Sequence, residues 1–177
     1  PAEPVAASDL IYTGKAQVGV SAGEGYTLSG DFQAPDAGAY AATATLDAGY
    51  VWKDGSKEAK TIEWSIDKAT LTATYAGEQV MRGVEPGYSV SVEGFVDGEN
   101  VTNAADFAMP TIADEDKPAA SELVTGFSKE LIPSGGSAKN YQFKYVGGTL
   151  KVVAAAGDLK PGAYTVTANL FVPGELN

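Results

Sequence analysis

The chain has 177 residues, of which 44% are hydrophobic, enough for a packed core and too many for wholesale disorder. Its 23 Asp and Glu residues against 12 Lys and Arg give a net charge of −11, which repels polyphosphate and argues against a nucleic-acid partner. The lack of cysteine and histidine excludes disulfides, thiolate nucleophiles, imidazole bases and the usual zinc sites. No apolar run approaches the ~20 residues that span a bilayer, so we expect no membrane insertion.

The first predicted unit spans residues 9–68 and consists of β-strands. The chain starts Pro-Ala-Glu-Pro, with neither an initiator Met nor a signal pattern, which is typical of a fragment of a longer chain. Apolar residues alternate with polar ones at residues 40–46 and 61–66, which indicates two half-buried strands. The side chains that we expect to be buried in this unit are those of Tyr40, Leu46, Ile62, Trp64 and Ile66, with Glu63 and Ser65 facing water.

The second predicted unit spans residues 69–155 and shows the same alternation. Its strands are expected at 70–75, 89–93, 141–145 and 149–153, and we interpret them as antiparallel. The buried side chains should be those of Leu71, Val90, Val92, Phe95, Tyr141, Phe143 and Leu150. The fold class is therefore all-β, as two small tandem β modules. Because no flexible spacer separates the units at 67–69, they should abut.

One stretch of the second unit has a helical alternative. Residues 101–109 follow a turn and end before Pro110, and Asn103 is a suitable cap for a short helical turn. This turn would carry Ala104, Ala105 and Phe107. A loop is the other interpretation, so the fold contains at most one short helical turn here.

The stretch "GAYAATATL" at residues 38–46 returns as "GAYTVTANL" at residues 162–170, with six of nine positions identical. After a short linker at 154–158, residues 159–177 contain this strand and nothing to pair with it. We interpret them as the truncated opening strand of a further module, and coincidence is the alternative. Such a strand seeks an edge, either on residues 9–155 or on a neighbouring copy, so a strand-exchange contact is expected.

The sequence contains no recognisable catalytic, cofactor or metal motif. A serine nucleophile would lack its histidine base, and the glycine pair near 134–137 lacks the lysine and helix of a phosphate loop. The acidic stretches at 113–117 and 97–100 lack the ligand spacing of an EF-hand. An isopeptide crosslink would need a buried lysine, and the strand lysines Lys144 and Lys151 alternate with the buried face. We therefore expect no enzyme, no cofactor and no metal.

Two aromatic residues form the one candidate ligand surface. Tyr50 and Trp52 share a face of "GYVWKDG" beside a turn, where they could stack on a sugar. The alternative is that both close the end of the core of the first unit. Burial of both side chains would exclude the sugar platform.

Residues 69–153 resemble the MBG repeat, a mostly β variant of the β-grasp fold found in tandem in long bacterial surface proteins. The resemblance lies in "ATLTATYAGEQVMRGVEPGYSVSVEGFVDGENV" and "SGGSAKNYQFKYVGGTLKV". Residues 9–68 resemble a related bacterial immunoglobulin-like repeat through "LIYTGKAQVGV", "DAGAYAATATL" and "GYVWKDGSKEAKTIEWSIDKA". These motifs are structural rather than catalytic.

The resemblance implies a fragment of a larger secreted protein at the bacterial cell surface or cell wall. The expected role is a non-enzymatic spacer or adhesion module in a semi-rigid stalk, whose partners are the adjacent repeats of the same polypeptide. The alternative is a module that binds a host glycan or host protein through Tyr50, Trp52 or a strand edge.

Overall fold

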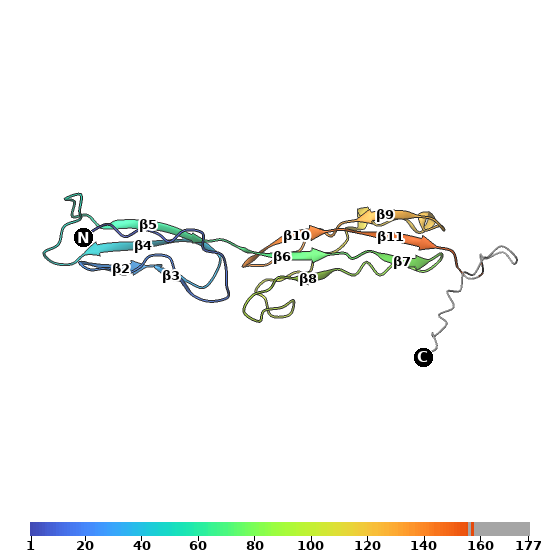
Figure 1. The fold of residues 1–177 in the computed structure, drawn as a ribbon, viewed down its shortest axis with the longest axis horizontal. Coiled ribbons are helices and arrows are strands. Elements are labelled where there is room, and N and C mark those ends of the chain that lie inside the picture. The colour runs from blue at the N-terminus through green and yellow to red at the C-terminus, as the bar shows by residue number, and fades with distance from the viewer. Residues whose placement is uncertain (156, 158–177) are drawn as a thin grey trace, which may run out of the picture.

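The chain forms two groups of strands that lie end to end along the long axis of the molecule (Figure 1). This computed structural model describes residues 1–155 and 157, so the strand predicted within 159–177 and its docking lie outside the described residues. We call residues 1–67 the first unit and residues 69–155 the second unit. The predicted mostly β fold is confirmed. In the described part of the chain, no helix is long and apolar enough to cross a membrane.

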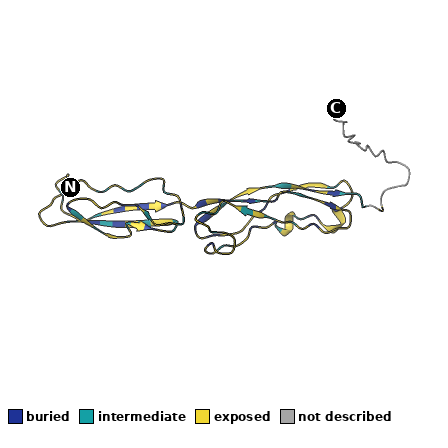
Figure 2. Ribbon diagram, turned by 60° about the horizontal axis from the view of Figure 1, so that its bottom comes forward, coloured by how far each residue is buried: buried dark blue, intermediate teal, exposed yellow. Residues whose placement is uncertain are grey.

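The first unit contains a three-stranded antiparallel sheet of order β2-β4-β5 and a separate antiparallel pair, β1-β3. Tyr40 lies opposite Trp64 in the register of β4 and β5. Figure 2 shows buried and exposed residues alternating along these strands. The strands are β1 Gln17–Val18, β2 Tyr26–Gly30, β3 Gln33–Ala34, β4 Gly38–Leu46 and β5 Lys60–Ile66.

The second unit contains two three-stranded sheets, of order β10-β6-β8 and β7-β11-β9. Two short 3-10 turns, η1 and η2, lie between the strands β8 and β9. The elements are β6 Ala69–Thr74, β7 Glu78–Met81, β8 Ser91–Glu93, η1 Asp114–Asp116, η2 Ala120–Glu122, β9 Ser128–Leu131, β10 Tyr141–Val146 and β11 Gly148–Val153.

The first and last strands of the second unit run side by side in parallel. β6 pairs with β10 and β7 pairs with β11, from Tyr141 opposite Ala69 to Val153 opposite Met81. The register never shifts, because every pair is 72 residues apart, as Gln142 and Thr70 are. We call this pairing the parallel ladder. The predicted antiparallel arrangement is therefore wrong for β6 with β10 and for β11 with β7, but it is confirmed for β6 with β8 and for β11 with β9. Side-chain alternation is the same in both arrangements and does not distinguish them.

The ladder stays closed at its midpoint, where neither strand is regular. The amide of Tyr75 donates to the carbonyl of Val146 at 3.0 Å. Gly77 has a φ of +79°, and a Cβ there would lie 2.6 Å from the carbonyl oxygen of Thr149. Glycine is thus required for the backbones to approach this closely.

The first unit also joins an early segment to its last strand in parallel, but this parallel pairing is much shorter than the ladder of the second unit. Ile11 forms a parallel bridge with Asp67 at the end of β5. The amide of Asp67 donates to the carbonyl of Leu10 at 2.8 Å, and the amide of Tyr12 donates to the carbonyl of Asp67 at 2.9 Å. In the second unit, the bond that corresponds to the one from Tyr12 to Asp67 runs from the amide of Arg82 to the carbonyl of Val153 at 2.9 Å, at the end of the parallel ladder.

The predicted strand registers are confirmed by burial. Glu63 and Ser65 are exposed, as expected, and Trp64 between them is buried. The other predicted core residues are all buried or half-buried. Those buried are Ile62, Ile66, Leu71, Tyr141 and Leu150, and those half-buried are Tyr40, Leu46, Val90, Val92, Phe95 and Phe143.

The hydrophobic core is continuous across the boundary between the two units. One apolar cluster contains Trp64 and Ile66 of the first unit together with Leu71 and Tyr141 of the second. A second cluster, around Tyr75, fills the far half of the second unit. Each sheet nevertheless takes its strands from one unit. The domain limits 9–68 and 69–155 stay a prediction, and the apolar packing continues across them.

Residues 101–109 form turns rather than the short helix considered from the sequence. Asn103 does not cap a following helix, because its side-chain oxygen accepts from the amide of Asn100 at 2.6 Å. Ala104 is buried, and the ring of Phe107 packs 5.6 Å from that of Phe95. This stretch is therefore a loop that packs on the core and is held by a side-chain hydrogen bond.

Candidate functional site

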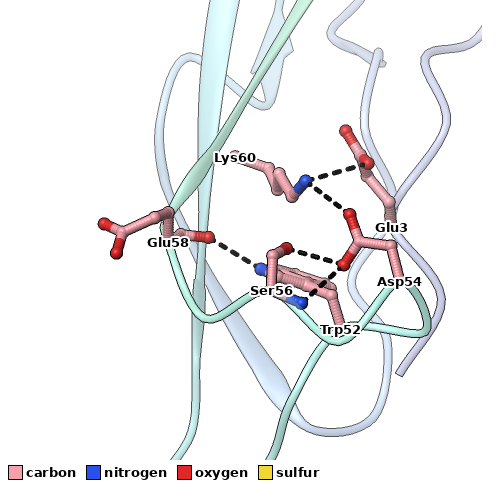
Figure 3. A network of polar contacts seen from close by, with 6 residues as sticks. All are labelled: Glu3, Trp52, Asp54, Ser56, Glu58 and Lys60. Carbon is pink, nitrogen blue, oxygen red and sulfur yellow. Dashed lines mark hydrogen bonds and ion pairs between the residues drawn. The ribbon is translucent and has the colours of Figure 1, made fainter.

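Trp52 lies inside the first unit, at the base of the loop between β4 and β5. Only 2% of its surface is exposed, and its ring centroid is 5.7 Å from that of Tyr26. The indole Nε1 donates to the carbonyl of Glu58 at 2.7 Å (Figure 3). Burial with a satisfied N–H is the usual state of a core tryptophan. Trp52 closes the end of the core, as the second interpretation of the sequence expected.

The turn after Trp52 is held by Asp54. Its Oδ1 accepts from the hydroxyl of Ser56 at 2.6 Å and from the amide of Ser56 at 2.8 Å, and Oδ2 accepts from Lys60 Nζ at 3.1 Å (Figure 3). These bonds, first those from Ser56 and then that from Lys60, lower the pKa of Asp54 to about 2. The carboxylate is therefore ionised at neutral pH, and its hydrogen bonds stabilise the turn.

Tyr50 has the opposite environment from Trp52. It is 43% exposed, and its ring lies against Gly25, where an added Cβ would be 2.6 Å from the ring. A shallow cavity of about 340 Å³ nearby is lined by Ala2, Glu3, Trp52, Lys53 and Asp54. Because Trp52 is buried, the two aromatic side chains do not share an exposed surface, and a ligand site at Tyr50 stays a prediction. The criterion that both side chains be buried is met by Trp52 alone.

The junction between the two units contains more buried polar contacts than the surroundings of Tyr50 and Trp52. Tyr12, which follows the parallel bridge of the first unit, packs edge to face on Tyr141, the first residue of β10, with ring centroids 5.4 Å apart. The hydroxyl of Tyr12 donates to Glu99 Oε1 at 2.8 Å, and the hydroxyl of Tyr141 donates to Glu99 Oε2. One carboxylate thus binds both units.

Burial and the Glu99 carboxylate both favour the neutral tyrosines. The pKa of Tyr141 rises to about 12, first because the hydroxyl is desolvated and then because it donates to Glu99. The same two causes, in the same order, raise the pKa of Tyr12. The hydroxyl of Tyr141 also accepts from the amide of Val96 at 3.1 Å, which fixes the loop that carries Glu99.

A second polar group at the junction is centred on Asn140. This residue is buried, and its Oδ1 accepts from the amide of Ala37 in the first unit at 3.0 Å. Its Nδ2 donates to Asp36 Oδ1 at 2.8 Å, while Lys139 Nζ donates to Asp36 Oδ2 at 2.8 Å. The bonds from Lys139 and then Asn140 lower the pKa of Asp36. The Lys139 pair is partly exposed and adds little stability, whereas the buried amide must keep its partners.

A third contact brings the two backbones close together. Gly14 has a φ of +78°, and a Cβ there would lie 2.5 Å from the Cβ of Asp97. The neighbouring Lys15 forms an exposed ion pair with Asp97 at 3.5 Å. Any side chain at position 14 would therefore push the units apart.

The acidic stretches show no geometry for a metal. In the loop at 113–117, Asp114 is paired with Lys117 at 2.6 Å, and this bond lowers the pKa of Asp114. Within 97–100, Glu99 is committed to the two tyrosines. Among the residues that the structure describes, no group of three or more acidic side chains could hold a metal ion. Lys144 and Lys151 are exposed, as predicted.

The junction residues were not predicted as a site. Tyr12, Glu99, Asn140 and Tyr141 all fall within stretches that carry the resemblance to surface repeats, and Tyr141 was predicted only as core. The available signal was an asparagine directly before an alternating strand, and the sequence alone does not show what it contacts. Comparison with protein-family models, curated proteins and solved structures finds no match for this chain.

Proposed function

We propose that this chain is a non-enzymatic spacer, two repeats of a semi-rigid stalk in a long extracellular protein of the bacterial cell surface or cell wall. The observation that carries the proposal is the junction. Glu99 accepts from Tyr12 of one unit and Tyr141 of the other, and Asn140 binds the backbone of the first unit. A joint with directional bonds on two sides resists bending, which a spacer needs and a freely hinged binding module does not.

The arrangement of the chain supports the same role. The first unit begins and the second unit ends at opposite ends of the molecule, so the two repeats extend its length instead of stacking beside each other (Figure 1). The chain crosses the junction directly from β5 to β6, through Asp67 and Lys68. The partners of each unit are then its neighbours in the same polypeptide. The bacterial surface setting is supported by the resemblance of the repeat motifs.

The alternative of a glycan-binding or host-protein-binding module has less support. Its predicted platform needed an open Trp52, and that residue is buried. Tyr50 by itself offers one exposed ring, which is the ordinary state of many surface tyrosines.

The proposal is tested by measuring the distance between the units. The chain has no cysteine, so spin labels can be placed at the exposed positions Thr45 and Ser128, in β4 and β9, by T45C and S128C. Pulsed EPR should give one narrow distance distribution. Adding Tyr12→Ala with Asn140→Ala should broaden it, while the control Tyr50→Ala should not. A broad distribution in the chain with an intact junction would contradict the spacer role.

A further inference from the structure

We propose that the second unit is built to bear tension, because the strand that receives the chain and the strand that releases it are joined along their length by the parallel ladder. The inference rests on the proposed spacer function only for the direction of the load, which runs from one end of the molecule to the other. It goes beyond that function, since stiffness against bending does not require strength against stretching.

The geometry of loading follows from where the chain enters and leaves. It enters the second unit at Ala69, beside the junction, and leaves at Val153, at the far end of the long axis (Figure 1). β6 and β7 form the receiving side of the ladder, and β10 and β11 form the releasing side. Tension therefore pulls the receiving side toward the first unit and the releasing side away from it.

Two parallel strands pulled in this way can separate only by sliding past each other. All the ladder hydrogen bonds then carry the load together, and none opens before the others. In an antiparallel pair of terminal strands, both pulled ends would lie at the same end of the sheet. The force would then open the bonds one after another, which needs much less force for the same number of bonds.

The surroundings of the ladder protect it from competing water. Leu71, Tyr75 and Leu150 are each no more than 1% exposed, so their side chains seal one face. β8 pairs with β6 on one outer side and β9 pairs with β11 on the other, both antiparallel. β6 and β11, the strands at which the chain enters and leaves, are thus each flanked by the ladder and by a second neighbour, while β7 and β10 lie at sheet edges. Hydrogen bonds shielded from solvent are electrostatically stronger than exposed ones.

The first unit is the weaker link by the same reasoning. Within the described residues, its parallel closure consists of the bridge between Ile11 and Asp67. The bonds that would resist sliding are those from Asp67 to Leu10 and from Tyr12 to Asp67. Under tension the first unit should therefore unfold before the second.

The test compares two directions of pulling on the same folded protein. Thr70, Lys144 and Lys151 are exposed, and the chain has no cysteine, so pairs of handles can be attached to T70C/K151C or to T70C/K144C. Thr70 and Lys151 lie at opposite ends of the ladder, so this pair shears it. Thr70 and Lys144 lie near the same end, two residues out of register, so this pair peels it open.

Single-molecule force spectroscopy should show a several-fold higher unfolding force for T70C/K151C than for T70C/K144C. The length released, about 3.3–3.6 Å per residue between the handles, identifies the event as unfolding of the second unit. Equal melting temperatures of the two variants would confirm that direction alone differs. Equal unfolding forces would overturn the proposal. That result would leave the spacer function standing, because the EPR distances depend on the junction and not on the ladder.

Discussion

Tyr12 and Tyr141 meet edge to face across the junction, with their ring planes at 82° and their hydroxyls sharing the Glu99 carboxylate. Such an aromatic pair contributes about 0.5–1.5 kcal/mol beyond the area it buries. The carboxylate adds a directional requirement that apolar packing alone lacks. The two units therefore have one preferred orientation, and several of its consequences can be measured.

Removing one hydroxyl from the junction should weaken the joint without opening a cavity. Tyr12→Phe keeps the ring against Tyr141 but removes the bond to Glu99, and a hydrogen bond to a charged group contributes about 1.5–3 kcal/mol. Urea denaturation should show a loss of this size in the free energy of unfolding. The control is Tyr50→Phe, at an exposed ring, which should change it by less than about 0.5 kcal/mol. Equal effects of the two substitutions would mean that the Glu99 bond adds nothing.

Alkaline pH should loosen the junction. The pKa of Tyr141 is raised to about 12 in the folded protein, from an ordinary value of 10.0, and that of Tyr12 is raised as well. A raised folded pKa stabilises the protein fully below the ordinary value, and this stabilisation is lost as pH rises toward the folded value. Melting temperatures measured between pH 9 and pH 12 should therefore fall above about pH 10.

The variant Tyr141→Phe provides the control for this pH dependence. It cannot ionise at position 141, so its melting temperature should fall less steeply over the same interval. Tyr75, whose pKa is also raised by burial and by its bond to Glu78, keeps a residual slope in both proteins. An identical slope in the variant would show that Tyr141 does not control the alkaline transition.

The sequence predicts which side chains of a strand face the core wherever polar and apolar residues alternate strictly. The alternation around Trp64 sets the register of β5, since a shift by one residue would bury Glu63. The direction of β6 and β10 could not be predicted, because side-chain alternation is the same in parallel and antiparallel pairs. The junction could not be predicted either. Its contacts join Tyr12 to Glu99 over 87 residues and Asp36 to Asn140 over 104, and no local pattern encodes them.

Trp64 should be a large contributor to the core of the first unit. It is buried, its ring centroid lies 4.7 Å from that of Tyr40 at a tilt of 30°, and it lies over Gly19, where an added Cβ would meet the indole ring. Trp64→Ala should lower the free energy of unfolding by about 3–5 kcal/mol. Chemical denaturation measures this, with Glu63→Ala as the exposed neighbour for comparison. An unchanged transition for Trp64→Ala would refute its core role.

The two candidate ligand residues should behave differently when truncated. Trp52→Ala removes a buried indole and should cost about 3–5 kcal/mol, while Tyr50→Ala should stay within about 0.5 kcal/mol of the parent. A glycan array probed with the parent chain should show no signal that Tyr50→Ala abolishes. A glycan that binds the parent and fails to bind this folded variant would restore the binding-module alternative.

Calcium should leave the protein unaffected. Asp114 is already paired with Lys117, and Glu99 is occupied at the junction, so neither acidic stretch presents free convergent ligands. A ligand that binds only the folded state raises the melting temperature once its concentration exceeds its Kd. Thermal melts with millimolar calcium and with a chelator should therefore coincide. A clear rise with calcium would reveal a site formed by these loops.

The contacts at the junction should hold the two units in one orientation. Residual dipolar couplings of backbone amides in weakly aligned protein test it directly, because each rigid body reports its own alignment tensor. A single tensor should fit the amides of β2, β4 and β5 together with those of β6, β10 and β11. Two tensors that differ in magnitude, one for each unit, would show independent motion and contradict it.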